Sequence, residues 1–285
     1  MNEIKMNDPK NGAEATEPLS AELLALATSL ARSAGETISA MRSEAVRSAT
    51  AKSTPTDPVT AADTEAERII VAGILDARPH DGVAGEEGAN KPGTSGVVWH
   101  IDPIDGTTNF IYGIAAYCVS IGVEVDGSMT AGVVYNPVVD ELFHAELGGG
   151  AFLNGEPIQA NASGDISTAL VATGFGYGPE RRRAQAKVLT GLMPEVRDIR
   201  RIGSAALDLC AVACGRADAY YEAGLNLWDL AAGWLIATEA GAICDDLRGN
   251  APGTHFMLAA GPALHPPLAQ LLIELEAERV IEPQT

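Results

Sequence analysis

The sequence predicts a mixed α and β protein, with helices on a mainly antiparallel sheet in its first half and a smaller α/β layer in its second half. Apolar residues repeat at helical spacing over 20–41 and 60–74, and from about residue 164 short apolar strands alternate with apolar helices. With 285 residues, 46% of them hydrophobic, the chain is long enough for one large core or two linked ones.

Two helices are expected to open the structure. Residues 1–18 are polar and show no periodic apolar face, so we expect a disordered leader. Ser20 is a good N-cap for a long amphipathic helix that reaches about Met41. Thr60 and Asp63 have the spacing of a capping-box variant, which predicts that a second helix begins there.

Strands and a hairpin follow these helices. Residues 97–101 are apolar and are expected to form a strand that Pro103 ends. Further strands are predicted over 118–125 and 131–135, and a hairpin over 143–152. These elements, together with both helices, constitute a predicted α+β subdomain of residues 19–163.

The pattern changes after about Gly164. Strands are predicted over 169–173 and 219–222, and helices over 182–192, 205–213 and 230–240. We therefore place a domain boundary there and predict an α/β subdomain of residues 164–285 that completes the substrate site.

The charge of the chain restricts its partners. Nineteen Lys and Arg residues against 38 Asp and Glu residues give a formal net charge of −19, which repels nucleic acids and anionic lipids. We expect no nucleic-acid or membrane partner, and an anionic substrate would require bound cations to reverse the local field. The absence of a signal-peptide core and of any apolar run near ~20 residues predicts a soluble, cytoplasmic protein.

The segment Asp102–Phe110 (DPIDGTTNF) carries the strongest chemical signal. It leaves a predicted strand and holds two carboxylates on a turn stiffened by proline. Mg²⁺ prefers such oxygen ligands in near-octahedral geometry. The backbone N–H groups of Gly106 and Thr107, at the start of a helix, are suited to phosphate oxygens. A metal subsite and a phosphate subsite are therefore expected side by side.

This nonapeptide resembles the signature of the inositol monophosphatase family. Further segments agree with the family pattern in chain order over about 52–242: Gly85–Gly88 (GEEG), Asp57–Thr60 (DPVT), Gly203–Ala206 (GSAA), Tyr220–Glu222 (YYE) and Trp228–Asp229. Alone, each segment is more typical of a turn, a helix cap or a solvated acidic loop. Together they imply a metal-dependent phosphatase of small phosphorylated alcohols.

The resemblance implies roles for individual residues. Glu86, Asp102 and the Ile104 carbonyl would hold a first Mg²⁺ ion, and Asp102, Asp105 and Asp229 a second, with a third ion left open. Two ions ~3.5–4 Å apart would activate a water and stabilise the leaving alkoxide. Thr107 would orient this water and pass a proton toward Asp57, and Glu86 would share in catalysis. Substrate contacts are expected from Asp105, Gly106, Thr107, Ala205, Glu222 and Asp229.

The resemblance also implies a layered αβαβα fold with the site between the two halves, a homodimer, and inhibition by lithium. The first expected substrate is myo-inositol 1-phosphate, which makes the protein a phosphoric monoester hydrolase. Fructose 1,6-bisphosphate, histidinol phosphate and nucleotide 3′-phosphates stay open, because related enzymes share the metal ligands. A different class also stays open, a regulatory protein that binds transcription or RNA-processing machinery.

Overall fold

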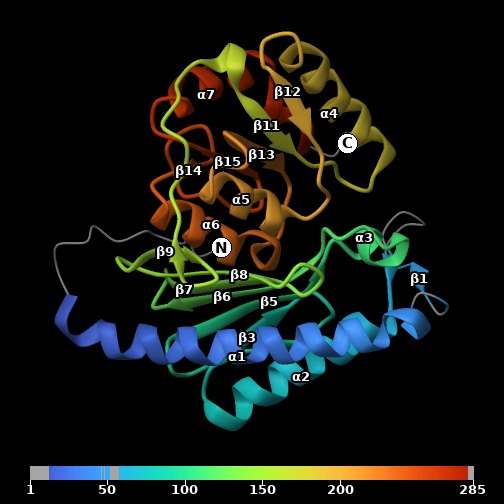
Figure 1. The fold of residues 1–285 in the computed structure, drawn as a ribbon, viewed down its shortest axis with the longest axis vertical. Coiled ribbons are helices and arrows are strands. Elements are labelled where there is room, and N and C mark those ends of the chain that lie inside the picture. Colours follow the sequence, from blue (N-terminus) through green and yellow to red (C-terminus); the bar gives the residue numbers. More distant parts are fainter. Residues whose placement is uncertain (1–12, 46, 48, 52–57, 282–285) are drawn as a thin grey trace.

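The computed structural model describes residues 13–281 except 46, 48 and 52–57. Five layers alternate between helices and sheets (Figure 1). Helices α1 (Ala13–Ala45) and α2 (Ala61–Ala77) cover the outer face of an eight-stranded sheet, α5 (Ala205–Ala213) and α6 (Leu227–Glu239) lie between the two sheets, and α4 (Pro179–Leu192) and α7 (His265–Glu274) cover a five-stranded sheet. The predicted αβαβα layering is confirmed.

The eight-stranded sheet carries the acidic segment of the chain. Its order is β10-β9-β8-β7-β6-β5-β3-β4, and all neighbours are antiparallel except the parallel pair β3 and β5. The strands are β3 (Gly82–Gly85), β4 (Asn90–Lys91), β5 (Val97–Asp105), β6 (Cys118–Val125), β7 (Ser128–Asn136), β8 (Glu141–Glu146), β9 (Gly150–Leu153) and β10 (Glu156–Pro157). Helix α3 (Thr107–Tyr112) follows β5, and β1 (Thr50–Ala51) pairs with β2 (Pro58–Val59) in a separate ribbon.

The five-stranded sheet has the order β12-β11-β13-β15-β14. It consists of β11 (Leu170–Thr173), β12 (Asp198–Arg200), β13 (Ala219–Ala223), β14 (Ile243–Asp245) and β15 (Phe256–Ala260), with short 3-10 turns at Ile166–Thr168 and Ala277–Ile281. Strand β11 is parallel to both neighbours, whereas β15 is antiparallel to its neighbours. The last strand of the eight-stranded sheet ends at Pro157, and the first strand of the five-stranded sheet begins at Leu170, so the two lie on either side of the predicted boundary. The division into two subdomains stays a prediction.

Helix α1 begins earlier than expected. It starts at Ala13, so Ser20 lies within the helix rather than at its N-cap, and the Ser20 hydroxyl donates to the Glu146 carboxylate at 3.0 Å. Ala and Glu, which dominate residues 13–17, are among the best helix formers, and this favours the earlier start of the helix. The predicted leader is therefore helical over residues 13–18, and residues 1–12 lie outside the described part of the chain.

Strand β5 does not end before Pro103. It continues to Asp105, and its register against β6 shifts between Asp102, opposite Ser120, and Asp105, opposite Cys118. β5 thus holds one residue more than β6 over this interval, which is a bulge. A proline is tolerated at a bulge because no ladder hydrogen bond is required of it.

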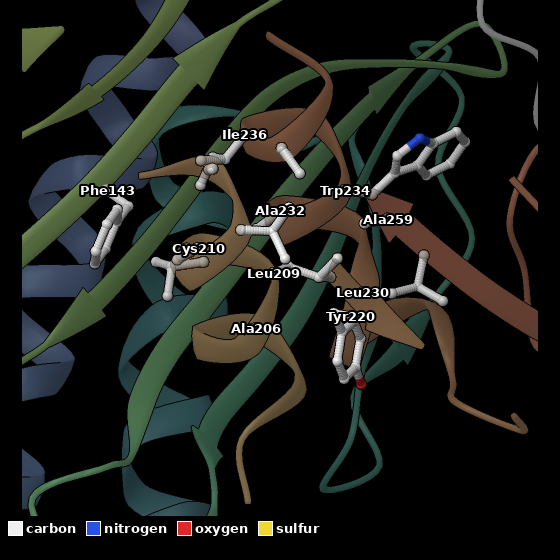
Figure 2. Close-up of a cluster of buried hydrophobic side chains, with 14 of the residues drawn as sticks. Phe143, Ala206, Leu209, Cys210, Tyr220, Leu230, Ala232, Trp234, Ile236 and Ala259 are labelled. Atoms are coloured by element: carbon white, nitrogen blue, oxygen red, sulfur yellow. The ribbon is translucent and has the colours of Figure 1, made fainter. Parts of the chain in front are cut away.

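The layer between the sheets is an apolar core around α5 and α6. Figure 2 shows Leu209 and Cys210 of α5, and Trp234 and Ile236 of α6, packed with side chains of both sheets. Helix α6 lies directly on two glycines of the large sheet: a Cβ at Gly122 would be 2.6 Å from the Ala231 Cβ, and one at Gly132 2.8 Å from the Ala232 carbonyl oxygen. The helix backbone therefore approaches the sheet very closely.

The cysteines of the chain are free thiols: Cys118 and Cys210 are buried, and Cys214 and Cys244 are half-buried. None of the helices in the described ranges combines the length and the apolar character that crossing a membrane requires.

Candidate active site

The acidic turn lies where the bulged end of β5 passes into α3. Asp102 and Asp105 are both buried, and the Ile104 N–H donates to Asp102 Oδ1 at 3.0 Å. Gly106 then adopts a φ of 97°, and a Cβ there would lie 2.9 Å from the Ala116 carbonyl oxygen, so only glycine fits. The bulge and this left-handed residue direct two neighbouring carboxylates inward.

Asp102 is the centre of a set of carboxylates. Burial raises its pKa well above the ordinary range, and the charges of Glu86, Asp105 and Asp229 raise it further. The four residues come from β5, α6 and the loop after β3, so three separate parts of the chain meet here. A negative charge on Asp102 is unfavourable unless a cation compensates it.

Asp105 is held by the start of α5. Its Oδ2 accepts hydrogen bonds from the Ser204 hydroxyl and the Ala206 N–H, both at 2.7 Å. Burial raises the Asp105 pKa to about 6, and these hydrogen bonds, with one from the Ala205 N–H, oppose the rise. The Ala205 N–H, expected to meet a substrate hydroxyl, thus faces Asp105 in this conformation. Ser204 was missed from the sequence, where it reads as the N-cap that it also is.

Asp229 lies in the first turn of α6. Its Oδ2 accepts from the Asn226 N–H at 2.7 Å in a capping box, so the capping interpretation and the site interpretation both apply. Burial raises the Asp229 pKa well above its ordinary value, followed by the charges of Asp105 and Glu86. The second half of the chain thus contributes a carboxylate to the cluster built on β5.

Glu86 lies in the loop that joins β3 to β4. Its N–H donates to the Ile101 carbonyl on β5 at 3.1 Å, and its side chain hydrogen-bonds to Asp102. The loop is also held by helix α2: the buried Glu67 carboxylate accepts hydrogen bonds from the N–H groups of Glu87, at 2.8 Å, and Ala89, at 2.9 Å. Glu67 was not anticipated, because nothing in the sequence distinguishes it from a surface helix glutamate.

The hydroxyl of Thr107 faces Asp63, which was predicted only as a cap. Thr107 Oγ1 lies 3.3 Å from Asp63 Oδ1 and 3.1 Å from the Ile104 carbonyl oxygen. The other carboxylate oxygen, Asp63 Oδ2, accepts from the Thr60 N–H at 2.9 Å, which confirms the capping box. Asp57, the expected proton acceptor, lies outside the described residues, so Asp63 is the carboxylate that the structure brings to Thr107.

Glu222 lies on β13 beside the cluster and is half-buried. Burial raises its pKa to about 7, although the Tyr220 hydroxyl, at 2.7 Å, and the charge of Arg201 lower it. The charge of Arg181 also lowers it, and Arg181 donates to the Ala223 carbonyl. Glu222 therefore sits between acidic and basic groups, where its ionisation responds to both.

The donor types fit a hard cation. Glu86, Asp102, Asp105, Asp229 and the Ile104 carbonyl offer the oxygen ligands that Mg²⁺ prefers. In the part of the chain that the structure describes, no three His, Cys, Asp or Glu groups are arranged to hold a metal ion as they stand. Asp102, Asp105 and Asp229 each accept a backbone N–H group through one carboxylate oxygen, which orients the side chain within the site.

Comparison with known proteins decides the family. The model of the inositol monophosphatase family matches residues 19–279, nearly the whole chain. The chain belongs to the inositol monophosphatase family. This membership confirms the family resemblance and supports a phosphatase, since the family is generally metal-dependent and acts on phosphorylated substrates.

Some relatives of this chain are named inositol-1-monophosphatase and others Nus factor SuhB. An inositol-1-monophosphatase of Mycobacterium leprae is 44% identical over 270 residues, which cover 90% of this chain and 92% of the relative. A Nus factor SuhB of Vibrio cholerae is 42% identical and covers 82% and 88%. The solved structure of an IMPase of Thermotoga maritima superimposes with a TM-score of 0.82 at 30% identity, covering 91% of this chain and 99% of that one.

Proposed function

We propose that this protein is a Mg²⁺-dependent phosphatase that hydrolyses myo-inositol 1-phosphate to myo-inositol and phosphate. The observation that carries the proposal is the group of four carboxylates around Asp102, two of them buried and two half-buried, together with the Thr107 hydroxyl that faces Asp63. The charges of its three neighbours raise the pKa of Asp102, so its ionised form needs a cation, and a hydroxyl with a carboxylate partner can move a proton. The M. leprae relative's name supports the choice of substrate.

Bound Mg²⁺, as two or three ions, would neutralise phosphate charge, activate the attacking water and stabilise the leaving oxygen. Glu86, Asp102, the Ile104 carbonyl, Asp105 and Asp229 would hold these ions. The N–H groups of Gly106 and Thr107 would bind phosphate oxygens.

The Thr107 hydroxyl, fixed between Asp63 and the Ile104 carbonyl, would accept a proton from the attacking water and pass its own proton to Asp63 Oδ1. No phosphorylated side chain forms in this scheme, because water itself attacks phosphorus. The inositol hydroxyls would contact Glu222, Asp229 and the Ala205 N–H.

Phosphate release from a panel of phosphomonoesters tests the proposal. We expect release from myo-inositol 1-phosphate that needs Mg²⁺, stops with EDTA and returns when Mg²⁺ is added. Higher turnover of fructose 1,6-bisphosphate, histidinol phosphate or a nucleotide 3′-phosphate would keep the chemistry and replace the substrate. No release from any of these compounds would contradict the enzymatic proposal. The same phosphate-release assay with added Li⁺ tests the predicted lithium inhibition. Analytical ultracentrifugation tests the predicted homodimer. The cytoplasmic location also stays a prediction.

A second candidate function follows from the V. cholerae relative, which is named a Nus factor. We propose as an alternative that the chain also binds transcription machinery. Pull-down with purified RNA polymerase and Nus proteins would test this, with an Asp102→Asn variant as the catalytically inactive control. Equal capture by both forms would establish a binding role separate from catalysis, and no capture by either would exclude it.

Replacing Glu222 with glutamine is expected to change the pH dependence of stability. The pKa of Glu222 is about 7 in the folded protein, against 4.5 for the free side chain. The folded state thus retains this proton longer than the unfolded state, so stability falls as pH rises from about 4.5 through 7. At ~1.4 kcal/mol for each tenfold change in proton affinity, the loss reaches roughly 3 kcal/mol by pH 8.

Urea unfolding in EDTA at pH 4 and pH 8 measures this effect. We expect Glu222→Gln and the unchanged protein to be equally stable at pH 4, and the variant to be more stable at pH 8. The Tyr220 hydroxyl can still donate to the glutamine oxygen, so the comparison isolates the charge. A constant stability difference between the two proteins at both pH values would contradict the prediction.

A further inference from the structure

The carboxylate of Glu67 binds the backbone of the loop that carries Glu86. Glu67 lies on α2, its side chain is buried, and its two oxygens each accept one backbone N–H, from Glu87 at 2.8 Å and from Ala89 at 2.9 Å. Hydrogen bonds from N–H groups to a charged acceptor are stronger than neutral ones, and burial protects them from water. Glu67 therefore binds the loop on both sides of Gly88.

The remaining backbone bonds complete this arrangement. The Gly85 N–H donates to the Ala89 carbonyl at 2.6 Å, and the Glu86 N–H donates to the Ile101 carbonyl at 3.1 Å. The loop is thus fixed to β5 through the Glu86 N–H and to α2 through the N–H groups of residues 87 and 89. These attachments fix the backbone from which the Glu86 side chain reaches Asp102.

Gly85 provides independent support for this contact. A Cβ at Gly85 would lie 2.2 Å from Glu67 Oε2, far inside van der Waals contact. Gly85 does not have a positive φ, so alanine is compatible with the backbone itself. The Glu67 carboxylate is therefore the main obstacle to a side chain at position 85. We call Gly85 and Glu67 a matched pair, because the carboxylate fits only where residue 85 has no Cβ.

We propose that Glu67 is a positioning residue that holds the Glu86 loop in its cation-binding geometry. The inference rests on the proposed function, because it assigns Glu86 to the metal site. Glu67 itself touches neither substrate nor ion. It acts through the backbone of residues 87 and 89, as partners behind a metal ligand do, and loss of such partners typically weakens metal affinity by ~10–100-fold.

The test compares Glu67→Gln with Glu65→Gln in the full-length protein. Glu65 lies on the same helix and bonds to Arg68 on the exposed side, so this control removes the same charge without touching the loop. Glutamine at 67 keeps one acceptor oxygen and turns an NH₂ group toward the second N–H donor. Mn²⁺ binding is measured by calorimetry without substrate, and backbone amide exchange is measured for the peptide containing residues 85–91.

We expect Glu67→Gln to weaken Mn²⁺ binding by roughly 10–100-fold and to speed amide exchange in the loop, while Glu65→Gln leaves both unchanged. The Mg²⁺ concentration for half-maximal activity should rise, and turnover at saturating Mg²⁺ should recover. Unchanged Mn²⁺ affinity in Glu67→Gln, with normal binding by the unchanged protein, would overturn the positioning role. An unchanged protein that binds no Mn²⁺ would instead overturn the proposed function and the role of Glu67 with it.

A second pair of variants guards against general loss of folding. Gly85→Ala should weaken Mn²⁺ binding in the presence of Glu67, because the added methyl group displaces the carboxylate. In a Glu67→Ala background the two closest atoms are gone and the Ala89 Cβ, at 3.1 Å, is the nearest neighbour left, so Gly85→Ala should cause little further loss. Additive losses in the double variant would contradict the matched-pair contact.

Discussion

Replacing Asp102 with asparagine is expected to lower Mg²⁺-dependent phosphate release by roughly 10³-fold or more, because the positioning and neutralisation of phosphate charge supply most of the rate enhancement. Asp102 is the member of the cluster whose pKa is raised by the charges of all three of the others, which places it at the centre. Initial rates at saturating substrate, across a range of Mg²⁺ concentrations, measure the effect. A variant that recovers full turnover at high Mg²⁺ would show that Asp102 is dispensable.

The same substitution should stabilise the metal-free protein. The pKa of Asp102 is higher in the folded state than in the unfolded state, so the folded protein loses stability as pH rises through that raised pKa. Asparagine removes this penalty while keeping the size of the side chain. Thermal unfolding in EDTA at pH 8 should therefore show a higher Tm for Asp102→Asn, and excess Mg²⁺ should raise the Tm of the unchanged protein more than that of the variant. Equal Tm values of the two proteins in EDTA would contradict the first expectation. An equal rise in Tm with Mg²⁺ for the two proteins would contradict the second.

Removing the hydroxyl of Thr107 is the second change with a large expected effect. In Thr107→Ala the attacking water loses its proton acceptor, and general-base catalysis typically contributes ~10²–10⁴-fold to the rate. We expect kcat to fall within this range with little change in KM, because the phosphate-binding N–H groups remain. Asp63→Asn should lower kcat in the same way, since it removes the carboxylate that receives the proton.

Asp63 also caps α2, so its variant needs a control for stability. Thr60→Ala removes the capping hydroxyl, and with it one hydrogen bond to Asp63 Oδ2, but it keeps the Thr60 N–H bond to that oxygen and leaves Asp63 Oδ1, which faces Thr107. It should lose about 1 kcal/mol of stability and keep near-normal kcat. If Thr60→Ala lowers kcat as strongly as Asp63→Asn, the loss belongs to the helix cap and the proton-transfer role of Asp63 is wrong.

The sequence predicted the features that depend on neighbours in the chain. The capping box at Thr60 and the acidic turn of residues 102–105 follow from local spacing, and both are present. The layered fold, which is also present, was implied by the family resemblance. The position of Asp229 at the start of α6 was also predictable, because an acid in a first helical turn has a local cause.

The features that sequence reasoning missed depend on contacts between distant residues. Asp63 reads as a cap because its partner Thr60 is three residues away, whereas its second partner, Thr107, is brought near only when α2 packs on β5. Glu67 follows one helical turn later and reads as surface charge, although it is buried against the next loop. Pro103 was expected to end its strand because a bulge cannot be anticipated from one strand alone.

The two glycines under α6 have a consequence for the spacing of the carboxylates in the candidate site. Gly122 and Gly132 let the helix rest on the sheet backbone, and the same helix carries Asp229 at its N-terminus while the sheet carries Asp102. A methyl group at either position would push the helix away from the sheet, and Asp229 would move with it. Two residues outside the candidate site thus act as spacers, because the approach of one backbone to another places carboxylates that belong to different halves of the chain.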